Sequence, residues 1–386
     1  MDCEGALIKF LLDKKLPAFP LAIASNLFSV TALLIFFGVT GNSELAAEVG
    51  IIQGATLTTF LAFSGNARNL ILGKSSDISF GQLVRFRTLF VFPFGLLAYF
   101  LCLSFIEVSG FFVIALTLRR CTEWLAELII TERECQEDYS FAGKYVFLQA
   151  ASFSTLLLRD TVSTEVYSTF FLFWAITPIL FGGKNLLPSL TALNNEKMYP
   201  GIKYIFHIGS SWVIATTTFV FRIMVIALTS KLIGGELFTA FAIGGMLNSI
   251  YTYVIGPSLI SKETKKSKKT FKVVLISCTV LGIAIIFLSE IISTILVSNV
   301  LFFQALGFSL VGSAIMMISQ RQRMVLLQIQ QESVFVPDVL TNVLIISIIP
   351  LFFYIAGTKA LGTLFFCSAC LTYIFYSLPI NIKKEM

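Results

Sequence analysis

The sequence predicts an all-α integral membrane protein with about twelve transmembrane helices. We expect them to form two six-helix lobes around a central cavity, with both termini in the cytoplasm. The chain has 386 residues, of which 56% are hydrophobic and 13% charged, and its mean hydropathy is +0.86. Soluble domains contain roughly a quarter charged residues. Apolar segments of the length that crosses a bilayer, about 20 residues, recur along the whole chain and leave no stretch for a separate soluble domain.

The helices are placed by the length of each apolar run and by the polar residues that flank it. The first run, from Leu16 to Gly41, is longer than the apolar core of a signal peptide and shows no clean cleavage site of small residues. We therefore expect it to be the first transmembrane helix. The predicted ranges, in order, are 17–40, 45–72, 86–106, 108–131, 141–158, 164–182, 204–229, 234–260, 271–295, 299–319, 335–356 and 360–380.

Basic residues support this count and predict the orientation. With the N-terminus in the cytoplasm, 22 of the 28 Lys and Arg residues fall in cytoplasmic segments, and only Arg159, Lys231 and Lys359 fall in outer loops. Loops with an excess of Lys and Arg remain in the cytoplasm. One missed helix would reverse the bias downstream, so the bias also supports the number of helices.

A weak internal repeat predicts the two lobes, 1–183 and 204–386, joined by a cytoplasmic linker at 184–203. An offset of 191 residues pairs Phe111 with Phe302, Gly54 with Gly245, and Gly65 with Gly256. Six helices per lobe is an even number, so both lobes cross the membrane in the same sense, as parallel repeats do. This architecture is typical of a transporter that rocks two lobes about a central cavity.

The predicted helix 108–131 carries four charges within nine residues: Arg119, Arg120, Glu123 and Glu127. Arg119 lies roughly 15 Å deep at 1.5 Å per residue, and the i,i+3 and i,i+4 spacings place all four side chains on one stripe. Such a stripe faces protein or water and avoids lipid. It is either a self-neutralised ladder of salt bridges or the polar wall of a substrate cavity, with Glu123 and Glu127 as candidates for binding a coupling ion.

The repeat favours the second interpretation, because the other lobe lacks these charges. The corresponding positions are apolar, namely Leu310, Val311, Ala314 and Ile318. A ladder needed only for architecture is expected in both lobes.

Two further arginines are candidate anion ligands. Arg222, in the outer half of the helix at 204–229, has no acidic residue within one turn and either extends outward to the interface or reaches the cavity. Arg68, at the inner end of the helix at 45–72, either extends a basic path to the cytoplasm or only marks the topology. Guanidinium binds phosphate through two parallel hydrogen bonds, so we expect an anionic substrate.

The sequence contains few of the residues and motifs that enzymatic chemistry requires. His207 is the one histidine, no GxxxxGK[ST] phosphate-binding loop is present, and the CxxC pair Cys367 and Cys370 has no second pair. Any one of the carboxylates Asp338, Glu290 and Glu48 could relay a proton, but all three lie near predicted helix ends, where single carboxylates are usually solvated. We therefore expect no enzyme activity, no cofactor, no metal and no nucleic-acid partner.

These features resemble the O-antigen-type polysaccharide flippases of the multidrug/oligosaccharidyl-lipid/polysaccharide (MOP) exporter superfamily. The resemblance rests on the helix count, the arginines within helices, "SGNARNLI" before a basic loop, and "LRRCTEWLAELIITER". It implies outward movement of a polyprenyl-pyrophosphate-linked oligosaccharide across a bacterial inner membrane by alternating access, driven by an ion gradient. It also implies that Arg119, Arg120 and Arg222 hold the headgroup, among membrane lipids and alongside the polymerase and glycosyltransferases of the pathway.

One departure from that family leaves an alternative open. Many relatives carry an arginine near the outer end of the first helix, where this chain reads "FFGVTGNSEL". An ion-coupled drug or solute exporter, of the same superfamily or of the major facilitator type, has the same helix count and parallel halves. The major facilitator signature is missing from the segment between the second and third predicted helices, and a drug site favours carboxylates over arginines.

Overall fold

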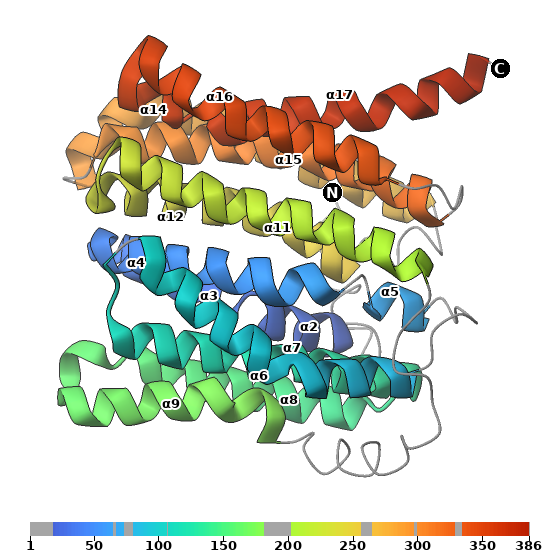
Figure 1. The fold of residues 1–386 in the computed structure, drawn as a ribbon. Coiled ribbons are helices and arrows are strands. Elements are labelled where there is room, and N and C mark those ends of the chain that lie inside the picture. Colours follow the sequence, from blue (N-terminus) through green and yellow to red (C-terminus); the bar gives the residue numbers. More distant parts are fainter. Residues whose placement is uncertain are drawn as a thin grey trace. The chain divides into compact units, whose positions relative to one another are not determined.

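The computed structural model describes residues 18–64, 67–72, 80–105, 107–180, 202–255, 265–296, 299–328 and 334–385, and all regular structure in these ranges is helical (Figure 1). The chain divides into two compact units. Unit 1 comprises Met1–Ser29, Ser64–Tyr99 and Gly110–Ile205; unit 2 comprises Val30–Phe63, Phe100–Ser109 and Phe206–Met386. Residues 30–63 thus pack with the C-terminal helices, so the lobe boundaries expected at 183 and 204 stay a prediction. Almost all of the expected linker 184–203 lies outside the described residues.

The helical segments follow the twelve predicted ranges in order. Their bounds are α2 Ala18–Leu27 and α3 Ser29–Val39; α4 Ser43–Thr56, the π-helical η1 Leu57–Leu61, the 3-10 turn η2 Ala62–Ser64, and α5 Ala67–Leu72; α6 Phe80–Phe105; α7 Gly110–Cys135; α8 Tyr139–Leu156; the 3-10 turn η3 Arg159–Thr161 and α9 Thr164–Leu180; α11 Ile202–Leu228; α12 Lys231–Ser249 and the π-helical η5 Ile250–Ile255; α14 Lys265–Leu296; α15 Val300–Gln328; α16 Phe335–Leu361; and α17 Leu364–Glu385. The first predicted helix is broken at Phe28, and the others begin and end within six residues of expectation, except that α15 continues nine residues beyond its predicted end.

Seven of the described helical segments are long and apolar enough to cross a membrane, or eight if α2 and α3 form one broken span. Helix α9 and the apolar part of α17, Leu364–Ser377, are shorter apolar helices. Helix α7 is not among the seven; it carries the four clustered charges, which a bilayer tolerates only where they face protein or water.

Unit 1 is built around α7, which packs against α2, α5, α8 and α9. Aromatic side chains fill the space between α7 and α9. The ring centroids of Phe112 and Phe171 are 5.3 Å apart, and those of Phe171 and Trp174 are also 5.3 Å apart, with each pair of rings edge to face. Both Phe171 and Trp174 are fully buried. This apolar packing surrounds the charged stretch of α7 with low-dielectric material, which strengthens its electrostatic interactions.

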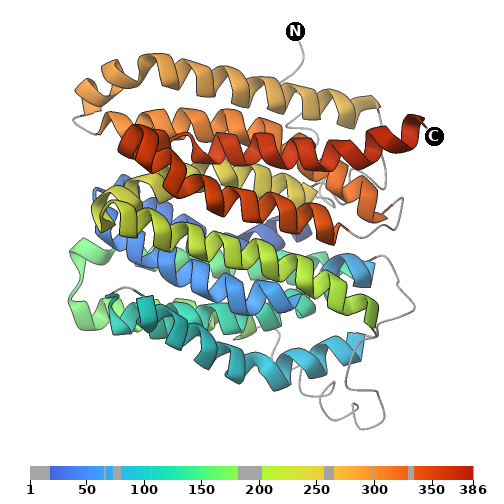
Figure 2. The same ribbon diagram turned by 45° about the horizontal axis from the view of Figure 1, so that its top comes forward.

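Unit 2 contains α4 packed on α12, α12 on α15, and α15 between α14 and α17 (Figures 1 and 2). Helices α14 and α15 approach closely at Gly282 and Gly307. A Cβ added to Gly282 would lie 2.7 Å from the Gly307 carbonyl oxygen, and the reverse substitution gives the same distance. Small residues permit such close packing between membrane helices. Phe287 and Ile295 leave the other face of α14 apolar and exposed, as a lipid-facing helix requires.

The two π-helical segments lie at similar positions when the chain is shifted by the offset of the predicted internal repeat. The offset of 191 residues carries η1 (Leu57–Leu61) to positions 248–252, and η5 begins at Ile250. Each π-helical segment follows a long helix, α4 or α12, and these two helices pack against each other within unit 2. A matching irregularity at matching positions is expected if the two halves of the chain arose by duplication.

Candidate functional site

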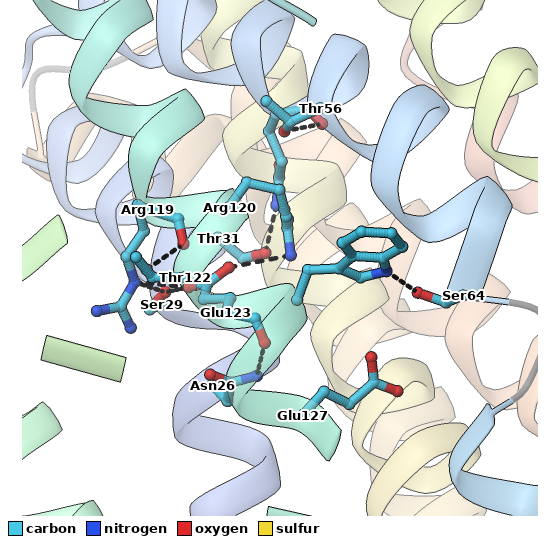
Figure 3. A network of polar contacts seen from close by, with 12 residues as sticks. Asn26, Ser29, Thr31, Thr56, Ser64, Arg119, Arg120, Thr122, Glu123 and Glu127 are labelled. Atoms are coloured by element: carbon cyan, nitrogen blue, oxygen red, sulfur yellow. Dashed lines mark hydrogen bonds and ion pairs between the residues drawn. The ribbon is translucent and has the colours of Figure 1, made fainter. Parts of the chain in front are cut away.

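Helix α7 brings three of the predicted charges into one buried cluster in unit 1. The exposed fraction is 0% for Arg119, 6% for Arg120 and 2% for Glu123. Glu123 lies one turn after both arginines, and the ion pairs expected from the i,i+4 and i,i+3 spacings are present. Figure 3 shows Ser29 and Asn26 of the α2–α3 segment meeting this part of α7. Asn26 Nδ2 donates to the Glu123 carbonyl oxygen at 3.1 Å.

The two oxygens of Glu123 have unlike surroundings. Oε1 accepts hydrogen bonds from the Ser29 hydroxyl and from Arg119 Nε, the latter at 2.7 Å. Oε2 lies 3.1 Å from Arg120 Nη1 in an ion pair, yet it accepts no hydrogen bond from any described residue. Arg120 Nε likewise has no hydrogen-bond partner in the described part of the chain. Two guanidinium groups therefore share one carboxylate, and the cluster carries one excess positive charge.

Arg119 is held by neutral groups of the neighbouring helices as well. Its Nη1 donates to the Trp174 carbonyl at 2.7 Å and to Thr177 Oγ1 at 3.1 Å, and its Nη2 donates to Gln149 Oε1 at 2.8 Å. The guanidinium also lies 4.4 Å from the Trp174 ring centroid, a cation–π contact. All three nitrogens of Arg119 thus bind protein and tie α7 to α8 and α9. This geometry favours the salt-bridge interpretation for Arg119.

Glu127 belongs to a different pair from the one its spacing suggested. Its Oε2 accepts from Arg87 Nη1 of α6 at 2.8 Å. Arg87 also donates to the Trp124 carbonyl, and its guanidinium lies 5.1 Å from the Trp124 ring. Arg87 is one of the 22 basic residues expected in cytoplasmic segments, but its side chain is only 1% exposed. No pattern within one sequence reveals this pair, because its members are 40 residues apart.

Arg68 forms a bidentate ion pair that sequence reasoning missed. Its Nε lies 3.0 Å from Glu134 Oε2 and its Nη2 lies 2.9 Å from Oε1. This fork geometry joins α5 to the end of α7 and is the strongest form of a charged hydrogen bond. Neither of the two interpretations of Arg68 from the sequence included an acidic partner.

Arg222 lies in unit 2, where α4 supplies the partners it needed from elsewhere. It donates to the Gly50 carbonyl and, at 2.9 Å, to Gln53 Oε1. Its guanidinium lies 5.7 Å from the Phe238 ring of α12. Arg222 therefore extends toward neighbouring helices in unit 2, and the outward extension considered from the sequence is not observed.

Unit 2 also contains a buried ionic cluster centred on Asp338, which is 0% exposed. The expectation that this carboxylate is solvated is wrong. Arg323 donates to it through Nη2 at 3.0 Å and Nε at 3.3 Å. The hydroxyl groups of Ser210 and Tyr376 also donate to it. Helices α11, α15, α16 and α17 each supply one of these four residues, so the cluster joins four helices; only the tertiary fold brings them together.

The other two carboxylates named from the sequence lie at helix ends. Glu48 Oε1 lies 3.5 Å from Lys231 Nζ in unit 2, and Glu290 is exposed. Within the described residues there is no group of three or more His, Cys, Asp or Glu side chains that could hold a metal ion. The side chain of His207 lies outside the described part of the structure.

No protein-family model matches the chain, and no curated protein matches its sequence. Solved structures do match its fold. The crystal structure of the eukaryotic MATE transporter AtDTX14 has a TM-score of 0.58 at 10% identity, covering 96% of this chain and 94% of that one. The outward-facing and inward-facing conformations of a multidrug resistance MATE family transporter of the MOP superfamily each have a TM-score of 0.50 at 12% identity, covering 96% of this chain and 95% of that one.

These similarities extend over nearly the whole length of both chains, and at 10–12% identity they show the fold. The apolar helices of unit 1 and unit 2 agree with that result. The chain is a multi-pass, all-helical membrane protein with the fold of the MATE transporters of the MOP superfamily.

Proposed function

We propose that this protein is a MOP-type exporter that moves a polyprenyl-pyrophosphate-linked oligosaccharide to the outer leaflet of a bacterial inner membrane by alternating access. The two lobes expected from the sequence, 1–183 and 204–386, are the moving bodies in this proposal. The matching structures include an outward-facing and an inward-facing conformation of a MATE family transporter, which supports alternating access. The pathway's polymerase and glycosyltransferases are the expected protein partners.

The observation that carries the anionic substrate is the excess positive charge in the core of unit 1. Arg119 and Arg120 share the single carboxylate of Glu123, while Glu127 is engaged by Arg87. A buried charge without full compensation is costly, and a pyrophosphate would neutralise it. Arg120 is the proposed headgroup ligand because it shares the single carboxylate of Glu123 with Arg119, and its Nε donates no hydrogen bond to the described residues.

Arg119 has a supporting role in this proposal. Its three nitrogens are engaged by Glu123, Trp174, Thr177 and Gln149, so it fixes the position of the carboxylate beside Arg120. Arg222 and Arg68 are proposed as further basic residues on the headgroup's route. Each has partners in the structure, and the substrate would have to displace them.

The test uses the purified full chain in proteoliposomes that contain a short-chain polyprenyl-pyrophosphate-linked saccharide. Delivery to the far leaflet is measured by the saccharide's accessibility to an added lectin. Arg120→Ala should slow delivery by about 10- to 100-fold, since a hydrogen bond to a charged group contributes about 1.5–3 kcal/mol. The matched control is Arg133→Ala on the same helix, whose partner Asp138 lies 3.3 Å away near the helix end, and it should deliver at nearly the wild-type rate.

A MATE-like drug exporter is the second candidate, because the matching structures include a multidrug resistance transporter. The same proteoliposomes, loaded with a cationic dye under a proton gradient, separate the two. Dye movement without saccharide delivery would replace the flippase by the drug exporter. Normal delivery by Arg120→Ala at a normal protein level would remove the proposed anion site.

A further inference from the structure

Helix α14 is longer than a bilayer requires, and its extra length is basic. It runs for 32 residues, from Lys265 to Leu296, which is roughly 48 Å at 1.5 Å per residue, whereas a hydrocarbon core is about 30 Å thick. Its apolar part, Phe271–Ile295, is the least buried of the seven apolar spans in the described residues. The remaining length lies at the N-terminal end, which the sequence predicts to be cytoplasmic, and five of the eight residues 265–272 are lysines.

The two sides of α14 have different surroundings. One side packs within unit 2: Cys278, Ser289 and Ser293 are buried, and α15 is the neighbouring helix (Figure 2). The other side, which we call the lipid face, is apolar, and each of its side chains is more than half exposed. It consists of Ile276, Val280, Phe287, Ile291 and Ile295.

The helical register continues the lipid face into the lysines. Counting back from Ile276 by 4, 7 and 11 residues gives Lys272, Lys269 and Lys265. Residues at these spacings share one side of an α-helix, and the Lys272 side chain is exposed. A lysine stripe, defined by these three positions, therefore leads directly into the lipid face.

Helix α15 adds a cation beside this stripe. The Arg321 guanidinium lies 5.7 Å from the centroid of the Phe271 ring, and Phe271 directly precedes Lys272. This cation–π contact holds a positive group at the same end of α14. The helix macrodipole contributes about half a positive charge there as well.

The charge of this end is not balanced from within α14. The one acidic residue of the helix is Glu290, 18 residues after Lys272 (290 − 272). Other basic residues expected in cytoplasmic segments do bind acids in the structure, in the pairs Arg68–Glu134, Arg87–Glu127, Arg133–Asp138 and Arg323–Asp338. Membrane orientation depends on the number of Lys and Arg residues in a loop, and it does not require them to be in register with an apolar face.

We propose that this end of α14 binds an anionic phospholipid of the cytoplasmic leaflet. The lysine stripe and Arg321 contact its phosphate group, and its acyl chains lie along the lipid face. Clusters of basic residues next to a membrane helix attract anionic lipids. A zwitterionic phospholipid has the same chains without the net charge, and soluble phosphate has the charge without the chains. This inference does not depend on which substrate the protein exports.

The experiment measures lipid binding to the purified full chain in detergent by native mass spectrometry. Phosphatidylglycerol and phosphatidylcholine with identical acyl chains are compared, and the wild type should bind phosphatidylglycerol about tenfold more tightly. The triple variant Lys265→Gln, Lys269→Gln, Lys272→Gln should bind phosphatidylglycerol about 10- to 100-fold more weakly, because each basic residue near the surface contributes roughly a factor of five. Arg321→Gln should weaken binding by about fivefold, and neither change should alter the binding of phosphatidylcholine.

Two control variants separate the stripe from net charge. Lys144→Gln, Lys383→Gln, Lys384→Gln removes three lysines from α8 and α17, at ends that the sequence also predicts to be cytoplasmic, and it should keep the wild-type preference. Replacing the lysine stripe by three arginines should keep the preference too, because the positive charges remain. Equal weakening by the two glutamine triples would show an effect of net charge alone and would overturn the proposed site.

Other occupants of the site give different results. Equal wild-type affinity for the two phospholipids would show that charge is not recognised, and displacement of phosphatidylglycerol by inorganic phosphate would indicate a site for the free anion. Either result would overturn the proposal. Tighter binding of a polyprenyl pyrophosphate than of phosphatidylglycerol, lost in the stripe's glutamine variant, would assign the stripe to the exported substrate instead.

The wild type alone decides the question if the glutamine variant of the stripe does not fold. An electrostatic site is screened by salt, so the preference for phosphatidylglycerol should fall severalfold as ammonium acetate is raised from about 50 to about 500 mM. A preference that does not change with salt would contradict binding through the lysine stripe.

Discussion

Glu123 of unit 1 and Asp338 of unit 2 are both buried carboxylates that bind arginine, and they differ in the balance of charge around them. Asp338 has one arginine, and each of its oxygens also accepts from a hydroxyl group, of Ser210 or Tyr376. None of the side chains of this cluster appears among the buried groups that lack a hydrogen bond in the described residues. Glu123 has two arginines, and Oε2 and Arg120 Nε lack hydrogen bonds.

Burial and pairing alone therefore do not identify a functional charge. A closed cluster with equal numbers of cations and anions, such as that of Asp338, holds helices together and leaves no group for a ligand. An open cluster with an excess charge and an unused donor is costly to maintain, which makes it the better candidate for binding.

The largest loss of stability should follow from removing the carboxylate at the centre of the Asp338 cluster. Asp338→Ala leaves the Arg323 guanidinium buried without its carboxylate, which should cost about 3–5 kcal/mol of the free energy of unfolding. Thermal unfolding of the purified chain in detergent measures the loss. Asp338→Asn keeps the shape of the side chain and should lose less. A wild-type melting temperature for Asp338→Ala would show that this cluster does not hold unit 2 together.

Replacing Arg119 and Arg120 by lysine, one at a time, should distinguish the structural role of Arg119 from the ligand-binding role proposed for Arg120. Arg119→Lys loses the fork that binds Gln149 and Thr177 and the planar contact with Trp174, and it should be destabilised by about 2–3 kcal/mol. Arg120→Lys keeps a cation beside Glu123 and should lose less, about 0.5–1.5 kcal/mol. The same unfolding assay compares them, and equal losses would contradict the assignment of different roles.

The sequence predicted the helices well because their signal is local. Apolar runs and flanking polar residues placed all twelve segments, and the spacing of Arg119, Arg120 and Glu123 predicted their pairing on one turn of α7. The break at Phe28 was not predicted. The stretch "ASNLFSV" around Phe28 contains no proline, the residue that usually marks an interrupted helix.

The long-range partners could not be read from one sequence. Glu127 was expected to continue the ladder of α7, but Arg87, 40 residues earlier, reaches it from α6. Asp338 was expected to be solvated because it lies near a helix end, yet Arg323, Ser210 and Tyr376 converge on it from three other helices. Such pairs depend on which helices become neighbours, and hydropathy and spacing do not specify that.

The smallest effect should come from deleting one hydroxyl group from each cluster. Tyr376→Phe removes a donor from Asp338, which has a single arginine, and should cost about 1.5 kcal/mol. Ser29→Ala removes a donor from Glu123, but Arg119 and Arg120 both remain beside that carboxylate, so the loss should be about 0.5–1 kcal/mol. Both losses are read from thermal unfolding in the same detergent. A larger loss for Ser29→Ala would mean that the second arginine does not compensate Glu123, and the excess charge assigned to unit 1 would then have to be withdrawn.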